Sequence, residues 1–169
     1  EKTLASMSTE DRLRQLFCLI TYSDDEEDLR RLAEQVRPGG IMSRAVPTEQ
    51  ALRTVRTLQE YSRIPMLISA NLESGGNGLL TDGTLFARPM AVAATDDTEQ
   101  ARRLGEICGT EGAAVGANWS FAPIVDIDYN WRNPITNTRT FGSDPERVRR
   151  MGLAYVNEVQ KHGMAACCK

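Results

Sequence analysis

The sequence has little of what several common protein classes need. It holds one histidine, His162, at the end of a predicted helix, so a Ser-His-Asp triad is not expected within these residues. Its 20 basic residues are outnumbered by 23 acidic ones, for a net charge of −3, whereas phosphate binding requires a basic excess. No apolar run approaches the roughly 20 residues of a membrane-spanning helix. We therefore expect neither nucleic acid nor a membrane among the partners.

Metal-binding motifs are also scarce. The four cysteines show no C-x-x-C spacing, which favours free, buried thiols over a zinc site that would use His162. The acidic run at 24–28 lies where a predicted helix starts, a position that suits acidic side chains, and is interpreted as a cap. We expect no metal and no other cofactor. No signal peptide is visible, but the chain begins at Glu1 rather than methionine, so the sequence does not identify the cellular compartment.

What the chain does contain is a regular alternation of strands and helices. The predicted strands are apolar on both faces, which is typical of a parallel sheet covered by helices. With 169 residues the chain can form a little over half of a (β/α)8 barrel, and a small doubly wound sheet is the alternative. The strands are expected at 16–22, 39–43, 64–70, 117–128 and 164–168, and the helices at 24–36, from Thr48 onward, at about 97–115 and at 144–162.

Polar side chains follow three of these strands at their carboxyl ends. Asn71 and Glu73 follow the third strand, Asp126 and Asp128 the fourth, and Lys169 the fifth. In a barrel this face carries the chemistry, and an open α/β sheet also binds ligands there. The two aspartates lie two residues apart, so in a strand they would share a face. They would then serve acid/base chemistry or bind a cation, and the alternative is that they orient loop side chains.

Two loops at this face have unusual compositions. "NLESGGNG" (71–78) contains three glycines, which let the backbone turn tightly and approach a ligand. It lacks the G-K-[ST] ending of a phosphate loop, so a nucleotide-binding open sheet is the weaker reading. "NTRTFG" (137–142) presents Arg139, whose guanidinium can hold two hydroxyls or a carboxylate in one fork. The alternative for Arg139 is an ordinary surface charge.

Taken in order, these segments resemble the N-terminal barrel of glycoside hydrolase family 3, of the β-N-acetylhexosaminidase type. The resemblance runs through "MSTEDRLRQLF", "RPGGIM", "LQEYSRIPMLISANLESGG", the long segment from "FARPM" to "SDPERV", and the final "GMAACCK". It covers almost the whole chain and is most specific between Glu111 and Arg147. It implies an α/β fold in which residues 1–169 form about five βα units of a barrel, with the chain ending before the barrel closes.

The resemblance also implies roles for particular residues. Asn71 stands where many members have an aspartate that holds sugar hydroxyls, and Arg139 matches an arginine that contacts the sugar. Lys169 matches a substrate-binding lysine, and Asp126 matches an aspartate at the end of the fourth strand. With Glu73, these residues form the predicted substrate-binding set. The resemblance places the catalytic aspartate nucleophile, and a histidine that assists it, beyond Lys169, so no catalytic residue is expected in this chain.

The chain departs from the family pattern at two places. Asn71 replaces the acid, which keeps hydrogen bonding but removes the charge. Leu79 and Leu80 occupy the region where hexosaminidases usually have an arginine that helps to bind the sugar.

The implied activity is hydrolysis of terminal, non-reducing β-linked sugars by a retaining mechanism, with this chain binding the carbohydrate substrate. A β-glucosidase of the same family and a non-catalytic sugar-binding protein on the same barrel are the alternatives. For residues 1–169 alone we expect pairing with the remaining half of the barrel or with another copy of the chain, because a barrel closes only when its last strand pairs with its first.

Overall fold

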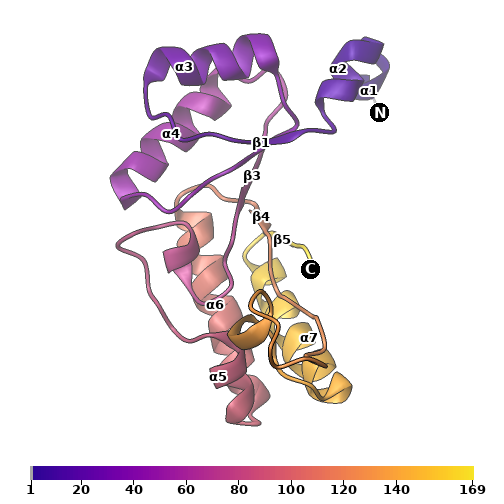
Figure 1. Ribbon diagram of the computed structural model, residues 1–169. Helices are drawn as coiled ribbons and strands as arrows, with labels where there is room; N and C mark the ends of the chain where they lie inside the picture. Colours follow the sequence, from indigo (N-terminus) through magenta and orange to yellow (C-terminus); the bar gives the residue numbers. More distant parts are fainter. Residues whose placement is uncertain (1) are drawn as a thin grey trace.

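Within residues 2–169, which the computed structural model describes, five parallel strands form one sheet (Figure 1). Each strand pairs with its successor along the chain, so the strand order is β1-β2-β3-β4-β5. A doubly wound sheet reverses its order at a switch point, whereas a barrel does not. The barrel-type prediction is therefore confirmed, as a five-strand part of such a barrel. The strands are β1 Cys18–Ile20, β2 Gly40–Met42, β3 Leu67–Ala70, β4 Trp119–Ser120 and β5 Ala165–Ala166.

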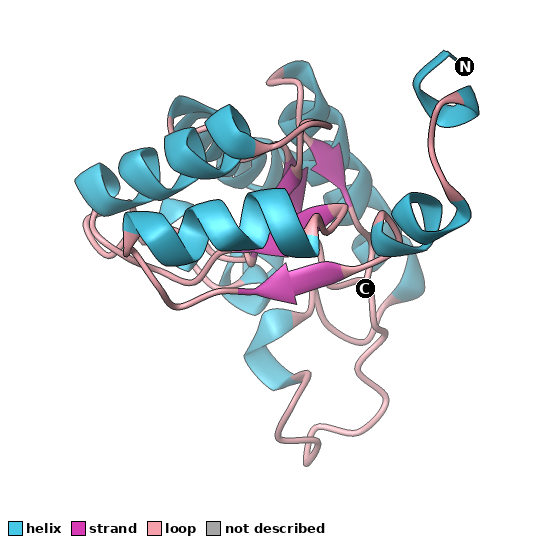
Figure 2. Ribbon diagram, turned by 90° about the horizontal axis from the view of Figure 1, so that it is seen from above, coloured by secondary structure: helices cyan, strands magenta, loops and turns pink. Residues whose placement is uncertain are grey.

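The regular strands are shorter than the segments predicted for them. Viewed from above, they lie together at the centre with the helices around them (Figure 2). Backbone pairing nevertheless continues past β4 and β5, because the amide of Val125 donates to Lys169 at 2.8 Å and the amide of Lys169 donates to Pro123 at 3.0 Å. The segment after Ser120 therefore runs beside the end of the chain without strand geometry.

The helices follow the predicted alternation, with additions. The helix predicted at 24–36 changes from α to π geometry at Leu32. Two short helices precede β1, and one further helix begins at Pro89, outside the helices that the sequence predicts. The helices are α1 Lys2–Ala5, α2 Thr9–Arg14, α3 Glu26–Arg31, the π-helix Leu32–Val36, α4 Thr48–Tyr61, α5 Pro89–Ala94, α6 Thr98–Ala114 and α7 Pro145–Lys161, with 3-10 turns at Gly76–Gly78 and Asn137–Arg139.

Aspartate caps define where three of these helices start. The side chain of Asp25 accepts from the amide of Asp28, and that of Asp97 accepts from the amide of Glu99. Asp144 accepts from two amides, and Pro145 occupies the first helical position, so this helix starts at the place that the sequence predicts. Each cap satisfies an amide that has no partner inside the helix. The interpretation of the acidic run as a helix cap is confirmed at Asp25.

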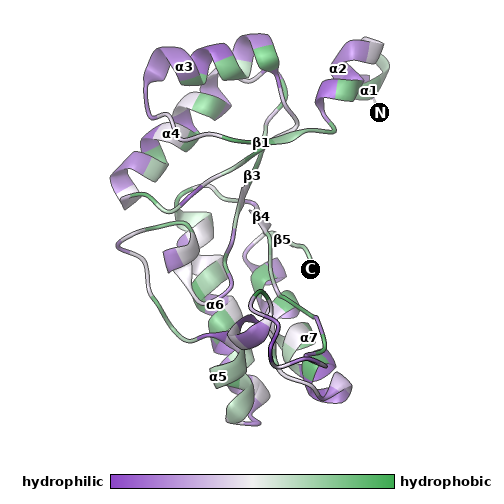
Figure 3. Ribbon diagram, in the orientation of Figure 1, coloured by the Kyte–Doolittle hydropathy of each residue, from purple (hydrophilic) through white to green (hydrophobic). Residues whose placement is uncertain are grey.

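The core lies between the sheet and the helices. Helices carry hydrophobic and hydrophilic stretches in alternation, as expected of helices with one buried side (Figure 3). Helices α6 and α7 lie side by side, and Gly105 brings them close because a Cβ there would lie 2.8 Å from the carbonyl oxygen of Tyr155. Tyr155 itself is 1% exposed. The close contact between these helices sets the position of buried side chains behind β3 and β4.

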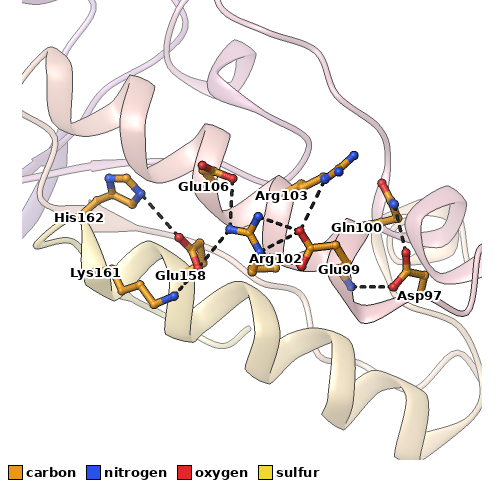
Figure 4. Close-up of polar contacts among 9 residues, drawn as sticks. All are labelled: Asp97, Glu99, Gln100, Arg102, Arg103, Glu106, Glu158, Lys161 and His162. Atoms are coloured by element: carbon orange, nitrogen blue, oxygen red, sulfur yellow. Dashed lines mark hydrogen bonds and ion pairs between the residues drawn. The ribbon is translucent and has the colours of Figure 1, made fainter.

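An ion-pair network also joins α6 to α7 at the surface (Figure 4). Arg102 pairs with Glu99 at 2.7 Å on its own helix and lies 3.5 Å from Glu158 on α7. Glu158 also pairs with Lys161 at 2.7 Å, and His162 lies 4.0 Å from it. The single histidine therefore belongs to this network at the end of α7.

The expectation of buried thiols holds for Cys108 alone. Cys18 and Cys167 are half-buried and Cys168 is exposed, and all four thiols are free. Cys167 and Cys168 follow β5, which has a neighbouring strand on one side only in the described chain, so they lack full cover. No helix in residues 2–169 is long and apolar enough to cross a membrane.

Candidate functional site

The carboxylate of Glu73 is the centre of a polar cluster at the carboxyl ends of the strands. Arg139 donates to it through two parallel hydrogen bonds, from Nε to Oε2 and from Nη2 to Oε1, both 2.8 Å long. Lys169 Nζ lies 2.8 Å from Oε1 and donates to Asn71 Oδ1 at 3.0 Å. We call Asn71, Glu73, Arg139 and Lys169 the Glu73 cluster. Four of the five predicted substrate-binding residues thus contact one another.

Different elements hold the members of this cluster. Asn71 and Glu73 follow β3, and Lys169 follows β5. Arg139 ends a 3-10 turn in the loop between β4 and α7, and its Nη1 also donates to the carbonyl oxygen of Ile135 at 3.1 Å. The contacts with Glu73 therefore tie the ends of two strands to a loop whose Arg139 is 66 residues from Glu73 in the sequence.

Glu73 is an anion held between two cations. It is 8% exposed, and burial alone would raise its pKa, but the hydrogen bonds from Arg139 and Lys169 outweigh burial and place the pKa below its usual range. The hydrogen bond to Glu73 raises the pKa of Arg139 in turn. Glu73 and Arg139 are therefore both charged at neutral pH.

The fifth predicted residue, Asp126, stands apart from these contacts. Its side chain is exposed and forms no hydrogen bond or ion pair with any residue in 2–169, although its charge contributes to the raised pKa of Arg139. Because β4 ends at Ser120, Asp126 and Asp128 do not share a strand face, contrary to one of the arrangements considered for them. Asp128 has one buried carboxylate oxygen without a hydrogen-bond partner among the described residues.

The glycines of "NLESGGNG" pack against protein atoms rather than opening a cradle for a ligand. A Cβ at Gly75 would lie 2.0 Å from the carbonyl oxygen of Thr84, and one at Gly78 would lie 1.8 Å from that of Asn71. A Cβ at Gly76 would meet the carboxylate of Glu111, which accepts from the amide of Thr84 at 2.9 Å. A carboxylate at this position repels phosphate. The loop therefore gives no support to the nucleotide-binding alternative.

Leu79 and Leu80 are 1% and 5% exposed and belong to the hydrophobic core. They supply no polar group to the Glu73 cluster. In residues 2–169, no three His, Cys, Asp or Glu side chains are grouped closely enough to hold a metal ion.

The Glu73 cluster is suited to binding rather than to bond breaking. It offers a guanidinium, an ammonium, an amide and a carboxylate, which together can donate to and accept from neighbouring hydroxyl groups. Retaining glycoside hydrolysis needs two carboxyl groups about 5–5.5 Å apart, one of them free to attack. Glu73 instead accepts contacts from two cations, so it is suited to holding those cations in place and is not free to attack a sugar.

Comparison with known proteins identifies related sequences and structures. The family model "Glycosyl hydrolase family 3 N terminal domain" matches residues 8–169. A β-N-acetylglucosaminidase/β-glucosidase of Cellulomonas fimi is 48% identical over 99% of this chain and 30% of its own length. A β-hexosaminidase of Pseudomonas aeruginosa (strain LESB58) is 32% identical over 83% of this chain and 43% of its own length.

A solved structure is similar along nearly the whole chain. The β-glucoside phosphorylase BglX bound to 2FGlc is 46% identical and superposes with a TM-score of 0.94, covering 99% of this chain and 31% of its own. The chain thus spans less than half the length of each of these relatives.

Proposed function

This chain belongs to glycosyl hydrolase family 3, and from that membership we propose that it works as part of a longer enzyme that cleaves terminal, non-reducing β-linked sugars. Residues 1–169 are part of the catalytic barrel in this proposal. The observation that supports it most strongly is the Glu73 cluster, where residues from three separate segments meet at the carboxyl ends of the strands. In barrel enzymes this is the face at which substrates bind.

In the proposed mechanism this chain binds the sugar and the nucleophile comes from outside these residues. An aspartate attacks the anomeric carbon while the bond to the leaving-group oxygen breaks and that oxygen takes a proton from the assisting acid/base residue. Water, deprotonated by the same residue, then hydrolyses the glycosyl-enzyme with net retention. Arg139, Lys169 and Asn71 hold hydroxyl groups of the non-reducing-end sugar, and Glu73 keeps the two cations in place. The exposed Asp126 is a further acceptor at the edge of the cluster. Such contacts accelerate the reaction to the extent that they tighten in the transition state.

The proposed substrate is a β-N-acetylglucosaminide. The Cellulomonas fimi relative is named for both N-acetylglucosaminidase and glucosidase activity, and the Pseudomonas aeruginosa relative is named a β-hexosaminidase. The test is a side-by-side assay of the longer protein on the aryl β-N-acetylglucosaminide and the aryl β-glucoside. A higher kcat/KM on the β-N-acetylglucosaminide supports the proposal. A clear preference for the β-glucoside would instead support the β-glucosidase alternative. No turnover of either would favour the non-catalytic sugar-binding alternative.

A second candidate is phosphorolysis, in which phosphate replaces water as the acceptor of the glycosyl group. It is favoured by the 46% identity to the β-glucoside phosphorylase over 99% of this chain. The two reactions share the first step and differ in the second, because phosphate attack releases the sugar 1-phosphate and water attack releases the free sugar. Product analysis with and without inorganic phosphate separates them. A rate that is independent of phosphate, with free sugar as the product, supports hydrolysis.

A further inference from the structure

A buried hydrogen-bond network lies directly behind the Glu73 cluster. Its centre is the carbonyl oxygen of Leu72, which accepts from the Tyr155 hydroxyl at 2.6 Å and from the Cys108 thiol at 3.2 Å. Ser120 Oγ lies 2.9 Å from the Tyr155 hydroxyl. All four residues are at most 1% exposed. The network joins α6, α7 and β4 to the loop that follows β3.

The hydrogens in this network can be assigned from its chemistry. A tyrosine hydroxyl has one hydrogen, and a carbonyl oxygen can only accept, so the Tyr155 hydrogen points at Leu72. Ser120 must then donate to Tyr155. Burial raises the pKa of Cys108 to about 12 and raises that of Tyr155 well above its usual value. Both groups therefore keep their protons at neutral pH and remain donors.

The carbonyl that they hold is part of the peptide bond between Leu72 and Glu73. Rotation of this peptide plane would swing the Glu73 side chain, because the plane sets the direction in which the chain leaves Leu72. Glu73 in turn engages Arg139 and Lys169 at 2.8 Å, and Lys169 reaches Asn71 on the other side of Leu72. A fixed Leu72 carbonyl therefore fixes the anchor of the whole cluster.

We propose that Tyr155 and Cys108 are positioning residues for sugar binding, which clamp the Leu72 carbonyl so that Glu73 holds Arg139 and Lys169 in the geometry that receives the substrate. This inference rests on the proposed function, since it assigns these buried side chains a role in the same reaction. The clamp lies behind the site and touches no substrate. Ser120 does not contact the Leu72 carbonyl itself but orients the Tyr155 hydroxyl that donates to it.

A purely structural role for the network makes a different prediction. If the hydrogen bonds only satisfied a buried carbonyl, their loss would lower stability and leave kinetics unchanged well below the melting temperature. If they position Glu73, their loss raises the inhibition constant of the monosaccharide product and lowers kcat/KM at temperatures where the variant is fully folded. Kinetics and melting must therefore be measured on the same samples.

The test uses the longer protein with four variants. Tyr155→Phe removes the hydroxyl while keeping the ring, and should lower kcat/KM about tenfold, which corresponds to ~1.4 kcal/mol. Cys108→Ala should give a smaller loss, and Cys108→Ser, which restores a donor, should recover most of it. Val159→Ala is the matched control, because Val159 is fully buried one turn further along α7 and makes no hydrogen bond to Leu72. It should lower the melting temperature without changing kcat/KM.

The outcomes separate this inference from the proposed function. Inactivity of the wild-type protein on every β-glycoside would refute the proposed function. Tyr155 and Cys108 would then have no sugar substrate for which to position Glu73. An active wild type with Tyr155→Phe and Cys108→Ala kinetically equal to Val159→Ala would overturn the positioning role alone. If Tyr155→Phe does not fold, the comparison of Cys108→Ala with Cys108→Ser decides. Equal kinetics in that pair would also overturn the clamp.

Discussion

Replacing Glu73 by glutamine removes the charge at the centre of the cluster and preserves its shape. Glu73 accepts three contacts of 2.8 Å from Arg139 and Lys169. A hydrogen bond to a charged group contributes about 1.5–3 kcal/mol. Glutamine keeps one oxygen, which can accept from two of the three donors at most, while its amide group faces the remaining donor, so at least one such contact is lost. Because the side chains of Arg139 and Lys169 are each 32% exposed, solvent screening reduces the loss, and we take about 2 kcal/mol.

This loss should appear in catalysis. In the variant the substrate must itself order Arg139 and Lys169, so about 2 kcal/mol is subtracted from its binding in the transition state, or roughly thirtyfold in kcat/KM. The assay is initial-rate kinetics of the longer protein on its best aryl glycoside. Glu158→Gln is the matched control, since Glu158 is 6% exposed and pairs with Lys161 at 2.7 Å, but belongs to the α6–α7 network of Figure 4.

The two variants should differ in opposite ways from the wild type. Glu158→Gln should lower the melting temperature and leave kcat/KM within twofold of wild type. If Glu73→Gln also stays within twofold, or if both variants lose activity equally, Glu73 does not organise the binding site.

Three further predictions follow from the same contacts. The pKa of Glu73 is lower in the folded than in the unfolded chain, where it is about 4.3, so its contribution to stability is complete above that pH and is lost as pH falls through the folded pKa. The free energy of unfolding, measured with urea at a series of acidic pH values, should fall with pH in the wild type and fall less steeply in Glu73→Gln. The same pH dependence in both proteins would contradict this prediction. The longer protein should turn over the aryl β-N-acetylglucosaminide faster than the β-glucoside, as the side-by-side assay will show. Residues 1–169 alone should associate or aggregate, because β1 and β5 each have an unpaired edge in the described sheet and the apolar side chains of Ile20 and Leu67 are each 47% exposed. They should also hydrolyse no glycoside, because the nucleophile is expected beyond Lys169. A monomeric mass in solution with a cooperative melt would refute the first expectation, and turnover would refute the second.

The fold was accessible from the sequence where local signals determine it. Asp144 and Pro145 predict the start of α7 because a cap and a preset φ act within a few residues. Strand lengths were overestimated, since apolar composition does not say where a neighbouring strand ends. The short helix α5 was missed because its few residues carry no resolvable period.

The site was only partly accessible. The predicted set contained every member of the Glu73 cluster. Sequence spacing could not show that Arg139 would bind Glu73, because the two residues are 66 positions apart and meet only in the folded chain. Asp126 and Asp128 were considered as a pair on one strand face, and the early end of β4 separates them from such an arrangement. Tyr155 was missed altogether, because a tyrosine on the apolar side of a helix looks like an ordinary core residue until its hydroxyl partners are known.

The role of the Glu73 cluster in sugar binding can be measured as the affinity of the longer protein for N-acetylglucosamine, with and without Arg139. Calorimetry should show that Arg139→Ala weakens binding at least tenfold while melting remains cooperative, because the variant loses the guanidinium that we assign to the sugar hydroxyls. Arg149→Ala, which removes an exposed arginine paired with Glu146 on α7, should bind like wild type. Equal affinities for the wild type and both variants would contradict the assignment of the Glu73 cluster as the sugar-binding site.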